Sequence, residues 1–144
     1  MIFDSTNLFS DAQAITATAA STNVIDLGET DTPKHAANAI TRDLGKGRPI
    51  DLRIQVVEDF ATLTSLTVSV QTDTAEGFGS AVTVLSSPAV PVASLVAGYV
   101  FPIQWVPRGV LSRYVRLNYT VAGTNATAGK VTAGFVFASD ERDV

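Results

Sequence analysis

Apolar side chains alternate with polar ones along most of this chain, the pattern of strands with one buried face. In one run, for example, Ile50, Leu52 and Ile54 alternate with polar neighbours. The same period of two predicts five long strands, at residues 50–56, 66–71, 99–105, 115–121 and 131–137. Shorter candidates lie at residues 13–18, 23–27 and 81–85. About eight strands with almost no helix predict an all-β fold, a jelly-roll-like antiparallel β-sandwich.

One long connection breaks this alternation. No strand period fits residues 28–49, and only residues 35–40 could form a single helical turn. From Pro33 to Pro49 there are four Lys or Arg residues against one Asp, although the whole chain has a net charge of −4. Long irregular connections in compact domains are usually functional or disordered. This loop is therefore either a basic element that docks on an acidic partner or a solvated loop.

A second unusual segment carries no charge at all. Residues 77–107 run for 31 positions without a charged side chain, and prolines interrupt them at positions 88, 91, 102 and 107. Proline removes a backbone donor, so this segment cannot be a membrane-spanning helix. Its apolar surface must lie in a β-rich core, against a partner, or both. Strands at residues 81–85 and 99–105 account for much of it, and residues 86–98 then point to a subunit seam.

The composition agrees with a domain whose surface is partly covered by other subunits when the protein functions. The chain has 144 residues, enough for one domain with its own core, and no cysteine, which excludes disulfides and thiolate metal sites. Charged residues are only 17% of the chain, below the roughly 25% of soluble domains. Oligomerisation would explain this deficit, as would a compact β-domain with a Ser/Thr-rich surface. The negative charge argues against nucleic acid as the main partner.

Catalytic and metal-binding patterns are absent from the sequence. His35 is the single histidine, and no nucleophile elbow or zinc-binding helix motif occurs. Asp26, Glu29 and Asp31 could offer oxygen ligands, but their spacing matches no EF-hand loop. The sequence therefore predicts a protein without enzymatic activity, cofactor or metal. The absence of a secretory signal after Met1 predicts maturation in a cytoplasm.

A carbohydrate-binding module is an alternative, because β-sandwiches often carry one. Such modules stack sugars on exposed aromatic rings. Trp105 shares a face with Tyr99 and Phe101, so we expect it to pack in the core. Tyr114 is out of phase with the apolar positions of its strand and is expected to be exposed. A single tyrosine is weak support for a sugar site.

Four stretches together carry a resemblance to a known family. They are MIFDSTNLFSDAQA at residues 1–14, IDLG at 25–28, RYVRLNY at 113–119 and AGKVTAG at 128–134. These stretches resemble the capsid cement, or decoration, proteins of tailed bacteriophages, particularly the family typified by a Bordetella phage. The resemblance covers nearly the whole chain. It implies a jelly-roll-like domain that sits on the outer face of an icosahedral shell, dimerises and bridges major capsid protein subunits.

Residues 1–11 carry apolar side chains before the first clear strand, so they either pack on the domain itself or form an arm that reaches a neighbour. The chain is therefore divided into an N-terminal arm, residues 1–11, and a single β-sandwich domain, residues 12–144, which includes the irregular loop. The arm and the loop are the expected capsid contacts. Their candidate residues are Ile2, Phe3, Leu8, Phe9, Lys34, His35, Arg42, Lys46 and Arg48. The candidate residues of a dimer seam are Pro88, Val90, Pro91, Val92, Leu95 and Val96.

The expected location is the outer surface of the virion, after assembly in the bacterial host cytoplasm. The expected partners are the major capsid protein and a second copy of the chain, without a membrane or direct nucleic-acid contact. A tail or baseplate structural domain and the carbohydrate-binding module are the alternatives.

Overall fold

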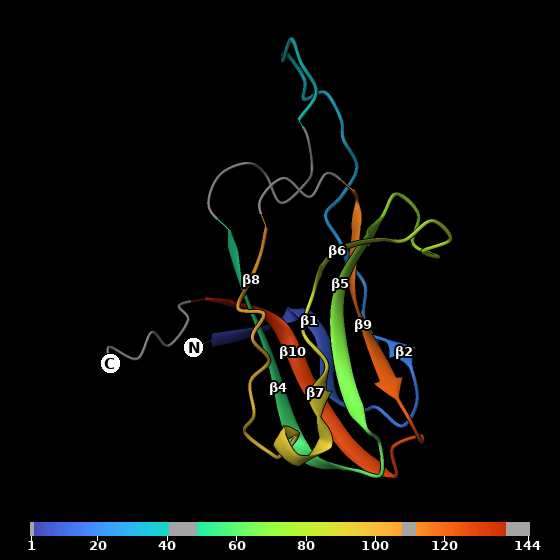
Figure 1. The fold of residues 1–144 in the computed structure, drawn as a ribbon. Coiled ribbons are helices and arrows are strands. Elements are labelled where there is room, and N and C mark those ends of the chain that lie inside the picture. The colour runs from blue at the N-terminus through green and yellow to red at the C-terminus, as the bar shows by residue number, and fades with distance from the viewer. Residues whose placement is uncertain (1, 41–48, 108–111, 138–144) are drawn as a thin grey trace.

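The computed structural model describes residues 2–40, 49–107 and 112–137, and it folds them into two antiparallel sheets (Figure 1). The strands are β1 (Ile2–Ala14), β2 (Ala19–Ala20), β3 (Ile25–Asp26), β4 (Ile50–Ala61), β5 (Ser65–Asp73), β6 (Val82–Ser86), β7 (Val90–Pro91), β8 (Trp105–Val106), β9 (Tyr114–Ala122) and β10 (Ala128–Phe137). One short 3-10 turn, η1 (Val92–Ser94), is the helical element of the described residues. The predicted all-β sandwich is confirmed.

The first sheet has the strand order β1-β10-β4-β8, and the second has the order β2-β9-β5-β6. β3 also pairs with β9, and β7 also pairs with β5. The longest unbroken register joins β5 to β9, from Ser65 opposite Ala122 to Asp73 opposite Tyr114. The chain crosses between the sheets several times, so the two layers cannot separate as independent units.

The core lies between the two sheets and is built from their alternating positions. The inward side chains of the four long strands β4, β5, β9 and β10 are Leu52, Ile54, Val56, Leu66, Val68, Val70, Val115, Leu117, Tyr119, Val131, Ala133 and Phe135. All of these side chains are buried. Burial of each large side chain contributes about 1.5–3 kcal/mol, so this interface supplies most of the stabilisation.

A buried polar link also joins the sheets. The Tyr119 hydroxyl on β9 lies 2.8 Å from Ser10 Oγ on β1. Ser10 donates its own proton to Gln13 Oε1 at 2.7 Å, so the Tyr119 hydroxyl is the donor to Ser10. Burial raises the pKa of Tyr119 well above its usual range, which keeps the phenol protonated. Both hydroxyls are thereby satisfied inside the core.

The residues expected to form a separate arm are part of the sandwich. β1 runs through the expected boundary at residue 11 and pairs with β10 from Ile2 opposite Phe137 to Ala14 opposite Lys130. Phe9 is completely buried and packs edge-to-face on Phe135, with ring centroids 5.1 Å apart. Three register shifts interrupt the pairing of β1 with β10 and break its period of two. The alternation therefore did not reveal this strand.

The strand expected at residues 99–105 is the clearest error. Only Trp105 and Val106 pair as β8, and Val100 forms an isolated bridge with Gln55. Pro102 has no N–H to give to a ladder. Phe101 is buried as expected, but Trp105 is 50% exposed rather than part of the core. Its partner across the pair is Asp51, so it lies on the outer face of the sheet.

Phe9→Ala is expected to lower the free energy of unfolding by about 3–5 kcal/mol, because it leaves a cavity next to Phe135. Phe3→Ala is the matched control from the same strand, where the ring is only half-buried. We expect it to cost less than about 1.5 kcal/mol. Urea unfolding followed by tryptophan fluorescence measures both, and equal effects would contradict the assignment of Phe9 to the core.

Candidate docking surface at the projecting loop

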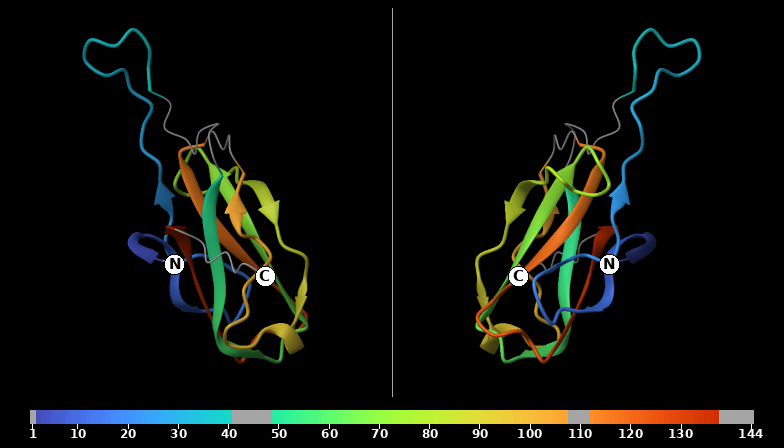
Figure 2. Two further views of the ribbon diagram at one scale, coloured as in Figure 1. Left: turned by 90° about the vertical axis from the view of Figure 1, so that its left-hand side faces the viewer. Right: turned by 90° about the vertical axis from the view of Figure 1, so that its right-hand side faces the viewer.

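Beyond β3 the chain leaves the sandwich and forms a long loop that projects far from both sheets (Figures 1 and 2). Every residue from Glu29 to Ile40 is exposed. The two arms of the loop meet where Ile40 N–H donates to the Asp31 carbonyl at 2.7 Å. The tip closes with a hydrogen bond from Ala36 N–H to the Pro33 carbonyl at 2.9 Å. The helical turn expected at residues 35–40 is not present.

The tip of this loop has a mixed chemical character. Lys34 and His35 occupy it, followed by three alanines within residues 36–39. His35 has a φ of 71°, in the left-handed region that non-glycine residues enter at a cost. The loop therefore presents one lysine, one histidine and small apolar side chains at the end of a narrow projection. This surface is suited to contact with another molecule and contributes nothing to the core.

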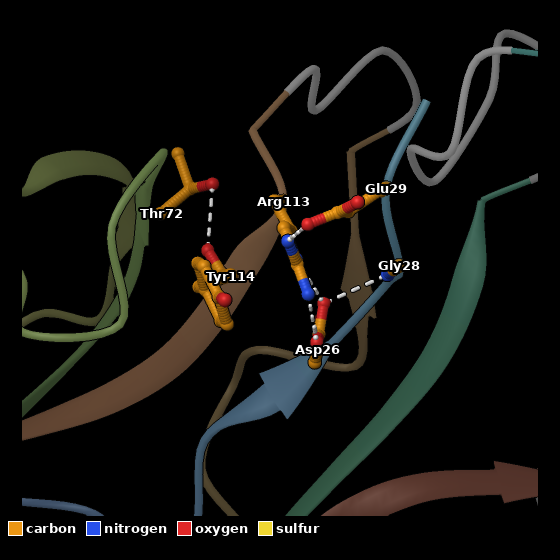
Figure 3. Close-up of polar contacts among 6 residues, drawn as sticks. All are labelled: Asp26, Gly28, Glu29, Thr72, Arg113 and Tyr114. Carbon is orange, nitrogen blue, oxygen red and sulfur yellow. Dashed lines mark hydrogen bonds and ion pairs between the residues drawn. The ribbon is translucent and has the colours of Figure 1, made fainter. Parts of the chain in front are cut away.

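A group of ion pairs holds the base of the loop (Figure 3). The Arg113 guanidinium donates to both carboxylate oxygens of Asp26, from Nε and Nη2 at 2.8 Å each. Its Nη1 donates to Glu29 Oε1 at 2.6 Å. Arg113 thus joins the residue at the end of β3 to the first exposed residues of the loop. A bidentate contact of this kind fixes orientation as well as distance.

Backbone contacts extend this clamp into the second sheet. Leu27 N–H donates to the Arg113 carbonyl at 2.8 Å, and Gly28 N–H donates to Asp26 Oδ1 at the same distance. Gly28 has a φ of 92°, which a side chain would oppose. Thr72 on β5 donates its hydroxyl proton to the Tyr114 carbonyl at 3.0 Å, next to Arg113. The loop therefore starts from a well-held point on a regular sheet.

The clamp has a clear electrostatic signature. Hydrogen bonds from Arg113, and then from the Gly28 N–H, lower the pKa of Asp26 from 3.8 to about 2. Hydrogen bonds to Asp26 and Glu29 raise the pKa of Arg113 further above its usual range. All three side chains are partly exposed, so solvent screens their attraction. The clamp sets the direction of the loop and adds little to global stability.

The structure separates the predicted capsid contacts into three groups. Lys34 and His35 are exposed on the loop, while Arg42, Lys46 and Arg48 lie outside the described residues. Ile2, Phe3 and Leu8 belong to β1, where Phe3 and Leu8 are half-buried. Phe9 is in the core, so its prediction as a surface contact is wrong.

A shallow apolar hollow of about 280 Å³ lies at the end of the first sheet, close to the start of β1. Its lining residues are Asn7, Ile50, Phe135, Val136 and Phe137. Ile2 pairs with Phe137 at this point. The start of β1 therefore lies beside the hollow, on a surface separate from the projecting loop.

The predicted dimer seam is only partly at the surface. Pro88, Pro91 and Val96 are exposed, and Val92 is half-buried. Val90 and Leu95 are buried in the core, so both were wrongly assigned to a seam. Leu95 turns inward where residues 87–104 cross from the second sheet to the first, and it fills the side of the sandwich.

The structure also places the side chains considered as metal ligands and as sugar-binding aromatic rings. Within residues 2–40, 49–107 and 112–137, no group of three His, Asp or Glu side chains could hold a metal ion. Asp26 and Glu29, considered as cation ligands, bind Arg113 instead. The Arg113 guanidinium also lies 4.9 Å from the Tyr114 ring centroid and occupies one face of it. Trp105 is the more exposed of the two aromatic candidates for a sugar platform.

Sequence reasoning missed Arg113, the residue that organises this surface. It lies 87 positions from Asp26, and nothing in the local pattern links them. Across the described ranges, no helix is long and apolar enough to cross a membrane.

The fold and this surface define an all-β sandwich domain with a projecting loop whose base is held by ion pairs. The sequence model of the Bbp16 family matches residues 9–135, so the chain belongs to the Bbp16 family. Membership of this family is consistent with a Bordetella phage protein, which agrees with the resemblance to phage proteins found in the sequence. The match includes the projecting loop, Arg113 and both sheets. No curated protein matches the chain.

Replacing Arg113 by lysine should loosen the loop while the charge is retained, because lysine cannot make the bidentate contact with Asp26. We expect trypsin to cut after Lys34 at least about threefold faster in Arg113→Lys than in the native chain. Arg53→Lys, on the other sheet, is the control. Cleavage at Lys34 is quantified by mass spectrometry, and unchanged cleavage would show that the clamp does not hold the loop.

The clamp should also respond to acid. The pKa of Asp26 is lower in the folded chain than its ordinary 3.8, so its contribution is complete above pH 3.8 and is lost as the pH falls towards about 2. The backbone amide NMR shift of Gly28, whose N–H donates to Asp26 Oδ1, should titrate in this range. In Asp26→Asn this shift should change far less there, and an identical titration in this variant would exclude Asp26 as the cause.

Proposed function

We propose that this protein is a phage capsid cement, or decoration, protein that binds the outer surface of the icosahedral shell and bridges major capsid protein subunits. Membership of the Bbp16 family supports a phage structural role. The observation that carries the finer proposal is the projecting loop. It extends a lysine and small apolar side chains away from the sandwich, from a base that Arg113 holds in place.

The geometry suits a bridging role. A sandwich can rest on one subunit while the loop reaches a neighbour across the joint. Because the base of the loop is already ordered, less conformational entropy is lost on binding. A protein that binds only the assembled shell stabilises it by mass action, and many copies add their effects around the shell. The shell thereby resists the outward pressure of packaged DNA.

On the virion surface the protein acts as a homodimer and has no enzymatic activity. Low charge supports an assembled state, since charged side chains are only 17% of the chain. Phage heads form in the bacterial cytoplasm, where the chain would join them without a membrane partner.

Heads that lack this protein should rupture at a lower temperature than heads to which it has been added back. Lys34→Glu should weaken binding to the heads about tenfold, because it reverses the charge at the tip of the loop. Glu76→Ala, in the exposed turn between β5 and β6, is the control and should bind normally. Co-sedimentation measures binding, and calorimetry measures the rupture temperature. Equal rupture temperatures with and without the protein would refute the proposal.

Binding measurements on purified heads, on tails and on the isolated chain distinguish the rival functions. A tail or baseplate protein would co-purify with tails and leave head stability unchanged. A carbohydrate-binding module would bind a glycan array as the isolated chain and lose that binding in Trp105→Ala. Either result would replace the capsid function by the corresponding alternative.

A further inference from the structure

One edge of the second sheet is unprotected. β6 pairs with β5 on one side, and among the described residues no backbone hydrogen bond occupies its other side. Val82, Thr83 and Ser86 are exposed, and the two residues between them are half-buried. Such an edge presents free N–H and C=O groups, which form a template for another strand.

The edges at β7, β8 and β1 carry features that natural proteins use to prevent such pairing, and the edge at β2 and β3 consists of strands of only two residues each. β7, which continues the β6 edge along β5, contains Pro91 and follows Pro88. The edge at β8 is flanked by Pro102 and Pro107. β1 carries acidic side chains and three register shifts. Prolines, charges and irregular pairing all oppose the addition of a strand.

β6 lacks most of these features. Its sequence, Val-Thr-Val-Leu-Ser, has no charge and no proline, and three of its five residues are β-branched. Its one irregularity is a single register shift opposite Val70 and Gln71. A segment of this composition has a high tendency to pair with another strand. An edge like this is expected to be covered when the protein is at work.

Charge identifies the occupant as a second copy of this chain. In an antiparallel pair around a two-fold axis, the residue on the axis faces its own copy, so a charge there meets a like charge. β6 lies within residues 77–107, which contain no charged side chain. Two copies can therefore approach along this edge without repulsion. A heterologous partner would place no such requirement on the edge residues 82–86.

We propose that β6 of one copy pairs antiparallel with β6 of a second copy, so that the two β5-containing sheets join into one continuous sheet. The inference rests on the proposed homodimer and assigns its interface. It moves the interface from residues 88–96, where Val90 and Leu95 are buried, to the neighbouring free edge.

Thr83→Lys tests this interface. Thr83 is exposed on the edge strand, and a lysine there would place two like charges close to the axis. The dissociation constant of the dimer should rise at least about tenfold in Thr83→Lys. Thr120→Lys, on the outer face of the same sheet, is the matched control and should remain dimeric. Sedimentation equilibrium measures both, and circular dichroism checks that both fold.

A second measurement does not depend on disrupting the edge. Because the chain has no cysteine, single cysteines placed along residues 82–86 can report proximity directly. At least one of them should form a disulfide-linked dimer under mild oxidation, whereas Thr120→Cys should not. A dimeric Thr83→Lys, a monomeric native protein, or the absence of cross-linking at every β6 position would each overturn the inference. A protein that dimerises through β6 but does not bind heads would refute the capsid function and leave this interface intact.

Discussion

The contact between the inner faces of the two sheets is the constraint on which the rest of the structure depends. Four long strands bury alternating side chains there, and the open sides must then be closed by connecting segments. Residues 87–104 cross one such side, where Leu95, Phe101 and Ile103 are buried. A charged side chain at any of these three positions would lose its hydration without gaining a partner. Burial therefore explains the absence of charge at these positions, whereas much of the uncharged stretch, including Val82 and Val96, is exposed.

The projecting loop is the opposite case, because it takes no part in the core. Residues 29–40 are exposed, so hydrophobic burial cannot hold their conformation. Polar contacts at the base take over this role, through Arg113 and the carboxylates of Asp26 and Glu29. Since exposed ion pairs contribute little to global stability, the loop can change without unfolding the domain. Residues of the loop can therefore be substituted to fit a partner without altering the sandwich.

The sequence predicted the regular parts of the molecule and failed where the period of two is interrupted. β4, β5, β9 and β10 follow from alternation, and the long irregular loop follows from its absence. Register shifts break the alternation in β1, so the pattern did not predict this strand. Residues 99–105 have the alternation of a strand, but Pro102 lacks the N–H that a regular ladder requires. Of the candidate contacts, Lys34 and His35 lie on the exposed loop, whereas Phe9 does not. The clamp joins residues 87 positions apart, and such pairings are decided by tertiary structure rather than by local pattern.

The loop and β6 lie at opposite edges of the second sheet, and their separation determines how a dimer could bridge its neighbours. β3, from which the loop departs, pairs with β9, while β6 pairs with β5 on the far side. Two copies joined antiparallel at β6 would therefore carry their loops at the two outer edges of the combined sheet. Antiparallel pairing reverses the strand direction between the copies, so the loops would project in opposite directions. A dimer of this form would contact two separate neighbours, because neither loop competes with the interface that joins the copies.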